Sequence, residues 1–190
     1  VGNYKNATTP CFNFELQWGS NICFPKLHFD LVGADGSQPN AYTISFSKVD
    51  VRSDKYVHLV AVLDAENRKA HCYLNGELKQ TVDVTAGEVF GKFDYAVNVP
   101  TLIGGDRRGD NAQYFKGKIK AVELYSDVRT AEEVAADYQR YLGGKVEDEA
   151  LLADYDFTQE GNEYVNDLSG NGHHLYYAPL EQGLNFGRVS

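Results

Sequence analysis

The sequence predicts an all-β protein, a two-sheet antiparallel β-sandwich with one short helix. Three observations lead to this prediction: apolar residues alternate with polar ones in several short segments, an Asn-Gly pair separates two such segments, and a single stretch has helical periodicity. Many short strands with one helix favour a sandwich over a barrel. At 190 residues the chain is long enough to bury roughly 70% of its unfolded surface as one domain.

The N-terminal half contains most of the alternating segments. Apolar residues occupy every second position in residues 12–18, 27–31 and 42–46, which places each set on one face of a strand. Residues 57–63 are apolar on both faces, as is typical of a central strand. The Asn75-Gly76 pair indicates a hairpin, because a type I′ turn needs a positive φ at both central positions.

One helix is predicted, and it follows a capping box formed by Thr130 and Glu133. A strand is expected before it at residues 118–125. After the helix, residues 151–157 and 184–186 are expected to be strands on either side of a turn-rich loop. The apolar stripe of the helix and its glycine stop are Val134, Tyr138, Tyr141, Leu142 and Gly143-Gly144.

The composition excludes several function classes. The chain has 18 Lys+Arg against 27 Asp+Glu, a formal net charge of −9, and no cluster of cations. We therefore expect no nucleic-acid partner, because a phosphate-binding face needs clustered positive charge. No apolar run approaches the roughly 20 residues of a membrane span, so no membrane insertion is expected. The chain has no methionine and opens on Val1, so we expect a processed product or an excised module of a larger protein.

The chain contains three cysteines, Cys11, Cys23 and Cys72. An odd number leaves at least one thiol unpaired, and Cys72 lies within a predicted strand. Two alternatives remain open, a Cys11–Cys23 disulfide or three buried thiols, because spacing alone does not determine connectivity.

Five short motifs follow one another in order within residues 56–142. They are Val57-His58-Leu59-Val60-Ala61-Val62, Tyr73-Leu74-Asn75-Gly76-Glu77, Leu102-Ile103-Gly104-Gly105, Tyr114-Phe115-Lys116-Gly117-Lys118-Ile119 and Val122-Glu123-Leu124-Tyr125. The series resembles the laminin-G-like, concanavalin A-like lectin modules, and the ordered series is more specific than any single motif. The resemblance implies a jelly-roll sandwich that binds glycans, in some members with calcium, and that occurs in secreted or surface proteins.

A second match to the same kind of module lies near the C-terminus. Tyr155-Asp156-Phe157 and Asp167-Leu168-Ser169-Gly170-Asn171-Gly172-His173-His174 resemble the opening of such a module. Residues 151–190 therefore either complete the sandwich in a permuted order or begin a second module. We expect completion, because a half-module would expose an apolar face and a sheet edge. On this basis residues 1–190 form a single lectin-like β-sandwich domain.

The loop that starts at Asp167 is the candidate calcium site, with a structural role for the ion. Calcium takes six to eight oxygen ligands; Asp167 and Asn171 would supply side-chain oxygens, and Ser169 and Gly170 would supply carbonyls. The alternative is an Asx-type turn, in which Asp and Asn satisfy nearby backbone groups. The resemblance implies an acidic residue near the metal, at a position where this chain has Lys120 instead.

A sugar site needs a flat aromatic side chain for the pyranose ring and polar groups for its hydroxyls. Trp18 ends an alternating strand, and residues 106–114 gather charged, amide and aromatic side chains in one loop. The alternatives are a core position for Trp18 and a solvated turn for the loop. The candidate ligand-binding residues are Trp18, Asp106, Arg107, Arg108, Asn111, Tyr114 and Tyr176.

The sequence lacks the common catalytic signatures. It has no cluster of glycosidase acids on one strand, no Gly-x-Ser-x-Gly elbow and no phosphate loop. We therefore expect a non-catalytic carbohydrate-binding module of an extracellular, cell-surface or periplasmic protein. Its expected partners are a glycan or polysaccharide and the neighbouring domains of the parent protein. The alternatives are a structural or protein-binding laminin-G-like spacer and a diverged glycoside hydrolase.

Overall fold

A computed structural model describes residues 1, 12–32, 40–84, 88–89, 101–105, 114–140, 150–159 and 164–176. The chain divides into two compact units. The first unit comprises Val1–Phe115 and Thr130–Leu142, and the second comprises Lys116–Arg129 and Gly143–Ser190. Within the described residues, no helix has the length and apolar character needed to cross a membrane.

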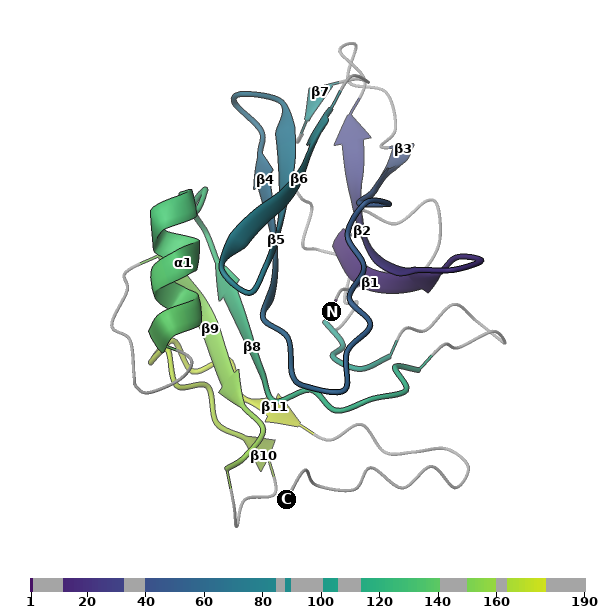
Figure 1. The fold of residues 1–190 in the computed structure, drawn as a ribbon. Coiled ribbons are helices and arrows are strands. Elements are labelled where there is room, and N and C mark those ends of the chain that lie inside the picture. Colours follow the sequence, from purple (N-terminus) through teal and green to yellow (C-terminus); the bar gives the residue numbers. More distant parts are fainter. Residues whose placement is uncertain are drawn as a thin grey trace. The chain divides into compact units, whose positions relative to one another are not determined.

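The first sheet lies in the first unit and has the strand order β1-β2-β3, with the short strand β7 also paired to β2 (Figure 1). Its strands are β1 (Phe12–Trp18), β2 (Cys23–Val32), β3 (Asn40–Ser45) and β7 (Glu88–Val89), and every pair is antiparallel. Leu27 and Phe29 of β2 and Ile44 of β3 are buried at alternate positions. The period-two prediction for these segments is confirmed.

The second sheet, also in the first unit, contains β4 (Leu59–Asp64), β5 (Lys69–Leu74) and β6 (Glu77–Asp83) in that order. The predicted hairpin joins β5 to β6, and Asn75 and Gly76 have φ values of 53° and 79°, as a type I′ turn requires. Among the described strands of this sheet β5 lies in the middle and β4 at the edge. The central position predicted for residues 57–63 is therefore wrong.

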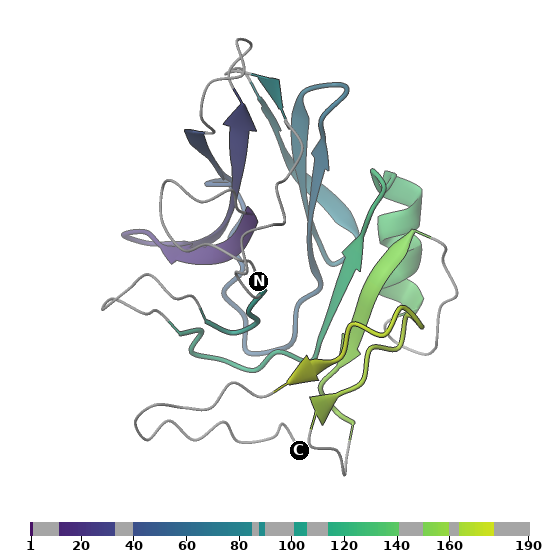
Figure 2. The ribbon, with the colours of Figure 1, turned by 180° about the vertical axis from the view of Figure 1, so that it is seen from behind.

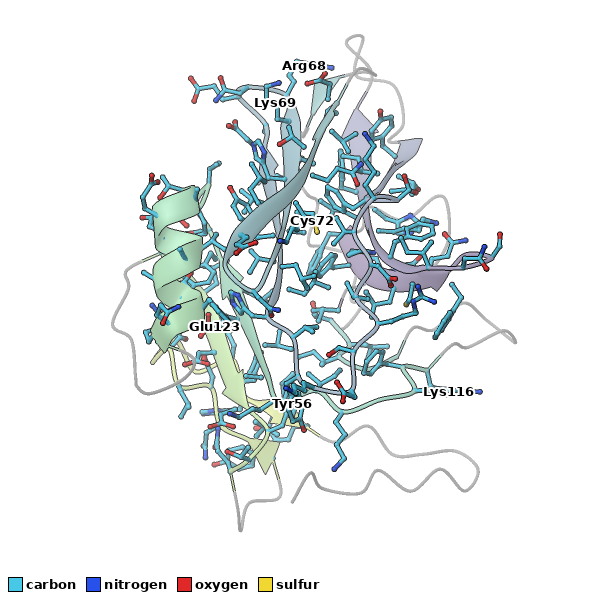
Figure 3. All side chains as sticks on the ribbon, viewed as in Figure 1. Tyr56, Arg68, Lys69, Cys72, Lys116 and Glu123 are labelled. Atoms are coloured by element: carbon cyan, nitrogen blue, oxygen red, sulfur yellow. The ribbon has the colours of Figure 1, made fainter. Side chains whose placement is uncertain are left out.

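The core of the first unit lies between these two sheets. Phe29 and Ile44 come from the first sheet and Ala70 and Cys72 from the second, and all four belong to one buried cluster. Figure 3 shows Cys72 pointing from its strand into this space. The arrangement is the two-sheet antiparallel sandwich that the sequence predicts.

Two of the three cysteines are described, and both are buried free thiols. The alternative of buried thiols is therefore confirmed for Cys23 and Cys72. Cys11 lies outside the described residues. Burial raises the pKa of the Cys72 thiol to about 12, so this side chain remains neutral and packs as a small apolar residue.

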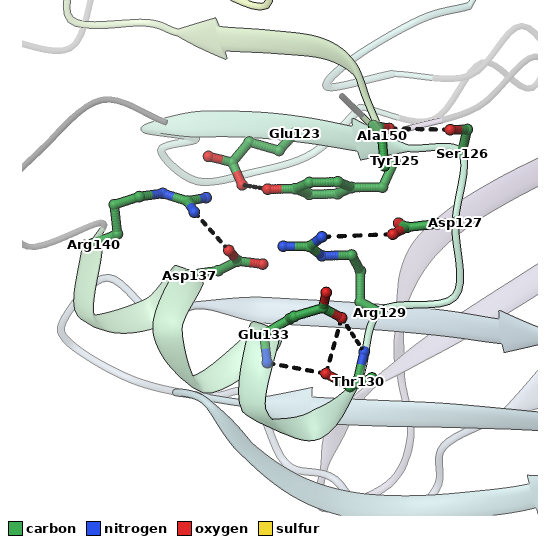
Figure 4. Close-up of polar contacts among 10 residues, drawn as sticks. All are labelled: Glu123, Tyr125, Ser126, Asp127, Arg129, Thr130, Glu133, Asp137, Arg140 and Ala150. Atoms are coloured by element: carbon green, nitrogen blue, oxygen red, sulfur yellow. Dashed lines mark hydrogen bonds and ion pairs between the residues drawn. The ribbon is translucent and has the colours of Figure 1, made fainter. Parts of the chain in front are cut away.

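The helix α1 (Ala131–Arg140) begins where the capping box predicts. The hydroxyl Oγ1 of Thr130 accepts the N–H of Glu133 at 3.2 Å, and Oε2 of Glu133 accepts the N–H of Thr130 at 2.7 Å (Figure 4). Near the other end, Arg140 forms an ion pair with Asp137 at 2.8 Å. The predicted helix end at residues 141–144 lies outside the described residues.

Helix α1 explains why β4 is apolar on both faces. Leu59, Ala61 and Leu63 pack against the core between the sheets. Val62, on the opposite face of β4, forms a second buried cluster with Val134 of the helix. Burial of both faces stabilises the strand by roughly 2 kcal/mol for each fully buried aliphatic side chain.

The second unit contains the strand pair β8 (Ala121–Tyr125) and β9 (Leu151–Asp156), seen from behind in Figure 2. Backbone hydrogen bonds extend the pair at both ends: Ser126 N–H donates to the carbonyl of Ala150, and Phe157 N–H donates to the carbonyl of Lys120, each at 2.9 Å. Both strands were expected, although β8 begins three residues later than predicted.

Two further strands of the second unit, β10 (Tyr164–Val165) and β11 (Leu175–Tyr176), pair antiparallel inside the segment predicted as a turn-rich loop. The sequence analysis missed them because a two-residue strand has no periodicity. The strand predicted at residues 184–186 lies outside the described residues. The single-domain organisation of residues 1–190 stays a prediction.

Candidate functional site

The hairpin between β1 and β2 carries the single tryptophan of the chain. Trp18 is the last residue of β1, and the turn is closed by a hydrogen bond from Gly19 N–H to the carbonyl of Ile22 at 2.8 Å. Phe14 and Leu16, at alternate positions of the same strand, pack against the core. Trp18, at the strand end, is 72% exposed. The core alternative for Trp18 is therefore wrong.

Polar side chains flank Trp18 along the chain. Gln17 precedes it, and Ser20 and Asn21 follow in the turn, and all three are exposed. Their amide and hydroxyl groups can both donate and accept hydrogen bonds. An exposed indole with such neighbours has the two components of a sugar contact, an apolar ring face and groups for hydroxyls.

The base of the second candidate loop is described, but most of the loop is not. An antiparallel bridge joins Gly105 to Tyr114, and Phe115 N–H donates to the carbonyl of Gly104 at 2.9 Å. Tyr114 and Phe115 are both exposed where the chain leaves the loop. The predicted ligand-binding residues that lie outside the described part are Asp106, Arg107, Arg108 and Asn111.

The loop after β10 is held by the buried side chain of Asp167. Its Oδ1 accepts the N–H groups of Asp154 and Ser169, each at 3.0 Å, and its Oδ2 accepts the N–H of His173 at 2.9 Å. The carboxylate therefore joins strand β9 to both ends of the loop.

Ser169 and Asn171 complete this arrangement through hydrogen bonds of their side chains. The hydroxyl of Ser169 donates to the carbonyl of Leu152 at 3.3 Å and accepts the N–H of Asn171 at 3.2 Å. The amide Nδ2 of Asn171 donates to the carbonyl of Leu151 at 2.8 Å. The structure thus brings three of the four predicted metal residues together, and it packs them against β9.

The electrostatics of Asp167 agree with this geometry. Burial opposes ionisation of the side chain, but the hydrogen bonds from Asp154, Ser169 and His173 outweigh burial and lower the pKa to about 2. The carboxylate is therefore charged at neutral pH, and N–H dipoles stabilise its charge.

The calcium site at this loop stays a prediction, and in the structure its side chains take part in hydrogen bonds. The ion needs six to eight oxygen ligands, but both oxygens of Asp167 accept N–H groups and the amide nitrogen of Asn171 faces a carbonyl. In the described part of the chain, no group of three or more His, Cys, Asp or Glu side chains could hold a metal ion. The geometry favours the Asx-type turn.

We expect a chelator to leave the thermal unfolding temperature of the chain unchanged, because hydrogen bonds from backbone N–H groups close the Asp167 loop. The measurement is differential scanning calorimetry in EDTA and in millimolar calcium. A higher unfolding temperature in calcium that Asp167→Asn removes would contradict this expectation and place the ion at the loop.

The remaining predicted residue, Tyr176, belongs to the second unit, whereas Trp18 and Tyr114 belong to the first. Tyr176 ends β11 and is 74% exposed. Its ring centroid lies 5.5 Å from that of Tyr164, its partner on β10. An aromatic residue is therefore available to solvent in each unit.

A polar network on the first sheet was not found from the sequence. Glu15 Oε1 lies 2.8 Å from His28 Nε2, and the other ring nitrogen of His28 lies 2.8 Å from the hydroxyl of Thr43. Asn13 Nδ2 donates to Glu15 Oε2 at 2.9 Å, and Asn13 and His28 are both buried. The network crosses β1, β2 and β3 on the face away from the sandwich core.

The sequence does contain a signal for this network, because polar residues occupy alternate positions of the three strands. Alternation alone predicts a solvated face, and only the register Asn13↔His28 and His28↔Thr43 brings the groups together.

Comparison with known families matches the chain over residues 3–135 to the family described as "Concanavalin A-like lectin/glucanases superfamily". The chain belongs to this superfamily. The match spans both sheets of the sandwich and reaches into helix α1, and the lectin-like resemblance of the five ordered motifs is confirmed. Strands β9, β10 and β11 of this concanavalin A-like chain lie beyond the matched residues. No curated protein matches the sequence.

Among solved structures, this member of the superfamily is similar to a candidate carbohydrate binding protein from Bacteroides ovatus. The two chains are 18% identical with a TM-score of 0.59, and the match covers 91% of this chain and 48% of the other. At this identity the likeness shows a shared fold. The chain spans about half the length of the Bacteroides ovatus protein.

Proposed function

We propose that this concanavalin A-like chain is a non-catalytic carbohydrate-binding module that acts outside the cytoplasm as part of a larger protein. The single observation that carries the proposal is the exposure of Trp18 at the tip of the β1–β2 hairpin. Burial of a large aromatic side chain normally stabilises a fold, so an indole left in water loses that stabilisation. A ligand that covers the indole recovers it.

The proposed contact is a pyranose ring stacked on Trp18. The apolar C–H face of the sugar meets the indole, and its hydroxyls meet Gln17, Ser20 and Asn21. The hairpin hydrogen bond from Gly19 to Ile22 orders the turn before the ligand arrives, which reduces the entropy lost on binding. The polar residues predicted in the loop that ends at Tyr114 would orient further hydroxyls.

Replacing Trp18 by alanine is expected to weaken polysaccharide binding at this site about tenfold or more, because a stacked aromatic contributes on the order of 1.4 kcal/mol. Affinity electrophoresis in gels that contain soluble xylans, mannans or β-glucans measures the retardation. Tyr56→Ala is the matched control, since Tyr56 is also an exposed aromatic of the first unit and has no role in the proposed contact.

Retardation that is equal for the wild type and Trp18→Ala would contradict Trp18 as the platform. A folded wild type that no polysaccharide retards would favour the structural spacer. Release of reducing sugar from a retarding polysaccharide would contradict the non-catalytic assignment.

A further inference from the structure

The second unit carries an aromatic cluster on one face of β10 and β11. The register pairs Tyr164 with Tyr176 and Val165 with Leu175, so the two tyrosines share one face and the two aliphatic residues share the other. The ring of His174 lies 5.2 Å from that of Tyr164. Val165 is buried, whereas His174 and Tyr176 are exposed. The cluster therefore faces solvent.

The backbone that leads into this cluster is held in place from two sides. The N–H of His173 donates to Asp167 Oδ2, and the carbonyl of His173 accepts the hydroxyl of Tyr155 at 2.6 Å. Tyr155 and Asp167 are both buried. The exposed rings thus rest on a rigid base, which is the usual requirement for a specific site.

The same contacts determine which nitrogen of His174 is the donor. The N–H of Asp167 donates to Nδ1 of His174 at 3.2 Å. In the neutral imidazole the proton is then on Nε2. The cluster offers one ring N–H donor and two phenol hydroxyls beside the exposed face of Tyr176.

This combination suits a neutral sugar. The ring of Tyr176 provides an apolar surface of about the size of one pyranose, and the hydroxyl and imidazole groups can hydrogen-bond to sugar hydroxyls. These three side chains include no arginine or lysine to pair with the carboxylate of an acidic sugar. A proline-rich peptide would need a longer row of aromatic side chains.

We propose that Tyr164, His174 and Tyr176 form a second sugar-binding platform, separate from Trp18, that binds a neutral pyranose. The proposal rests on the proposed function, because it extends carbohydrate binding to a second place on the chain. Its consequence is that one chain binds two sugar segments, and that removal of Trp18 leaves one of the two sites.

Isothermal titration of the full chain with cellohexaose, xylohexaose and mannohexaose tests the platform. We expect two sites for the hexaose that binds, one site in Trp18→Ala, and none in Trp18→Ala combined with Tyr176→Ala. Tyr176→Phe keeps the stacking ring and should stay within about threefold of the wild-type affinity. Leu152→Ala, which removes an exposed side chain from β9 of the same unit, should change nothing.

The outcomes separate this proposal from the proposed function. A single site that Trp18→Ala removes and Tyr176→Ala leaves intact would contradict the second platform and leave the proposed function standing. Failure of the folded wild type to bind any of the three hexaoses would contradict both. The sugar assignment would be overturned if the chain bound decaproline, if Tyr176→Ala abolished that binding, and if Tyr176→Ala left hexaose binding unchanged.

Discussion

Replacing Asp167 by alanine is expected to destabilise the second unit by about 3 kcal/mol, on the order of 1 kcal/mol for each N–H group that loses its acceptor. The donors are the backbone N–H groups of Asp154, Ser169 and His173. Because they lie on β9 and at both ends of the loop, the loop and the strand lose their connection together. Hydrogen exchange, read peptide by peptide, should show lost protection in residues 150–176 and unchanged protection in the first unit.

Asp167→Asn is the matched control, because asparagine keeps the size of the side chain and one accepting oxygen. We expect it to retain the bonds to Asp154 and Ser169 and to lose the bond to His173, at a cost of about 1 kcal/mol. Equal protection in the wild type and Asp167→Ala would contradict the role assigned to this carboxylate.

The pH dependence of stability gives a second readout of the same carboxylate. Its pKa is about 2 in the folded chain, below the usual 3.9 of an unfolded aspartate. The unfolded state therefore binds the proton first, so the stabilisation is complete above about pH 4 and is lost as the pH falls through 2. The expected loss of stability on acidification is about 1 to 2 kcal/mol after allowance for solvent screening. The stability of Asp167→Asn, measured against pH beside the wild type, should lack this loss.

Replacing Gly76 by alanine is expected to destabilise the first unit by about 2 to 5 kcal/mol, for two reasons. The positive φ of 79° costs an alanine about 1 to 2 kcal/mol. A Cβ at this position would also lie 3.1 Å from Cβ of Tyr138 and 3.3 Å from Cα of Ala135, and relief of such crowding costs about 1 to 3 kcal/mol more. Urea unfolding followed by far-ultraviolet circular dichroism measures the change.

Gly172→Ala separates the two causes. Gly172 has nearly the same φ, 78°, but nothing within 4 Å of an added Cβ, so alanine there should cost only the backbone strain of about 1 to 2 kcal/mol. Similar costs for Gly76→Ala and Gly172→Ala would show that the hairpin does not approach helix α1 as closely as the structure places it.

The parts of the fold that could be predicted are those set by neighbouring residues. The Asn75-Gly76 turn and the Thr130–Glu133 cap each depend on a few residues close in sequence, and both form as expected. Strands β10 and β11 could not be predicted, because two residues carry no period and their pairing depends on the Asp167 loop between them.

The residue types of the candidate site could be predicted from the sequence, but the exposure of their side chains could not. Period two places Trp18 on the same face as Phe14 and Leu16, and only its place at the strand end leaves it in water. The link between Glu15 and His28 depends on the register of two strands, which alternation alone does not determine. For Asp167 the sequence left two alternatives, and the N–H donors from β9 favour the turn.

The central claim, that a sugar stacks on Trp18, has a direct probe because Trp18 is the one tryptophan in the chain. Its fluorescence should be that of a water-exposed indole, open to quenching by iodide. Titration with a polysaccharide that the chain binds should shift the emission to the blue and protect it from iodide, with the same saturation curve as binding itself. Saturable polysaccharide binding with no change in emission or quenching would contradict the account.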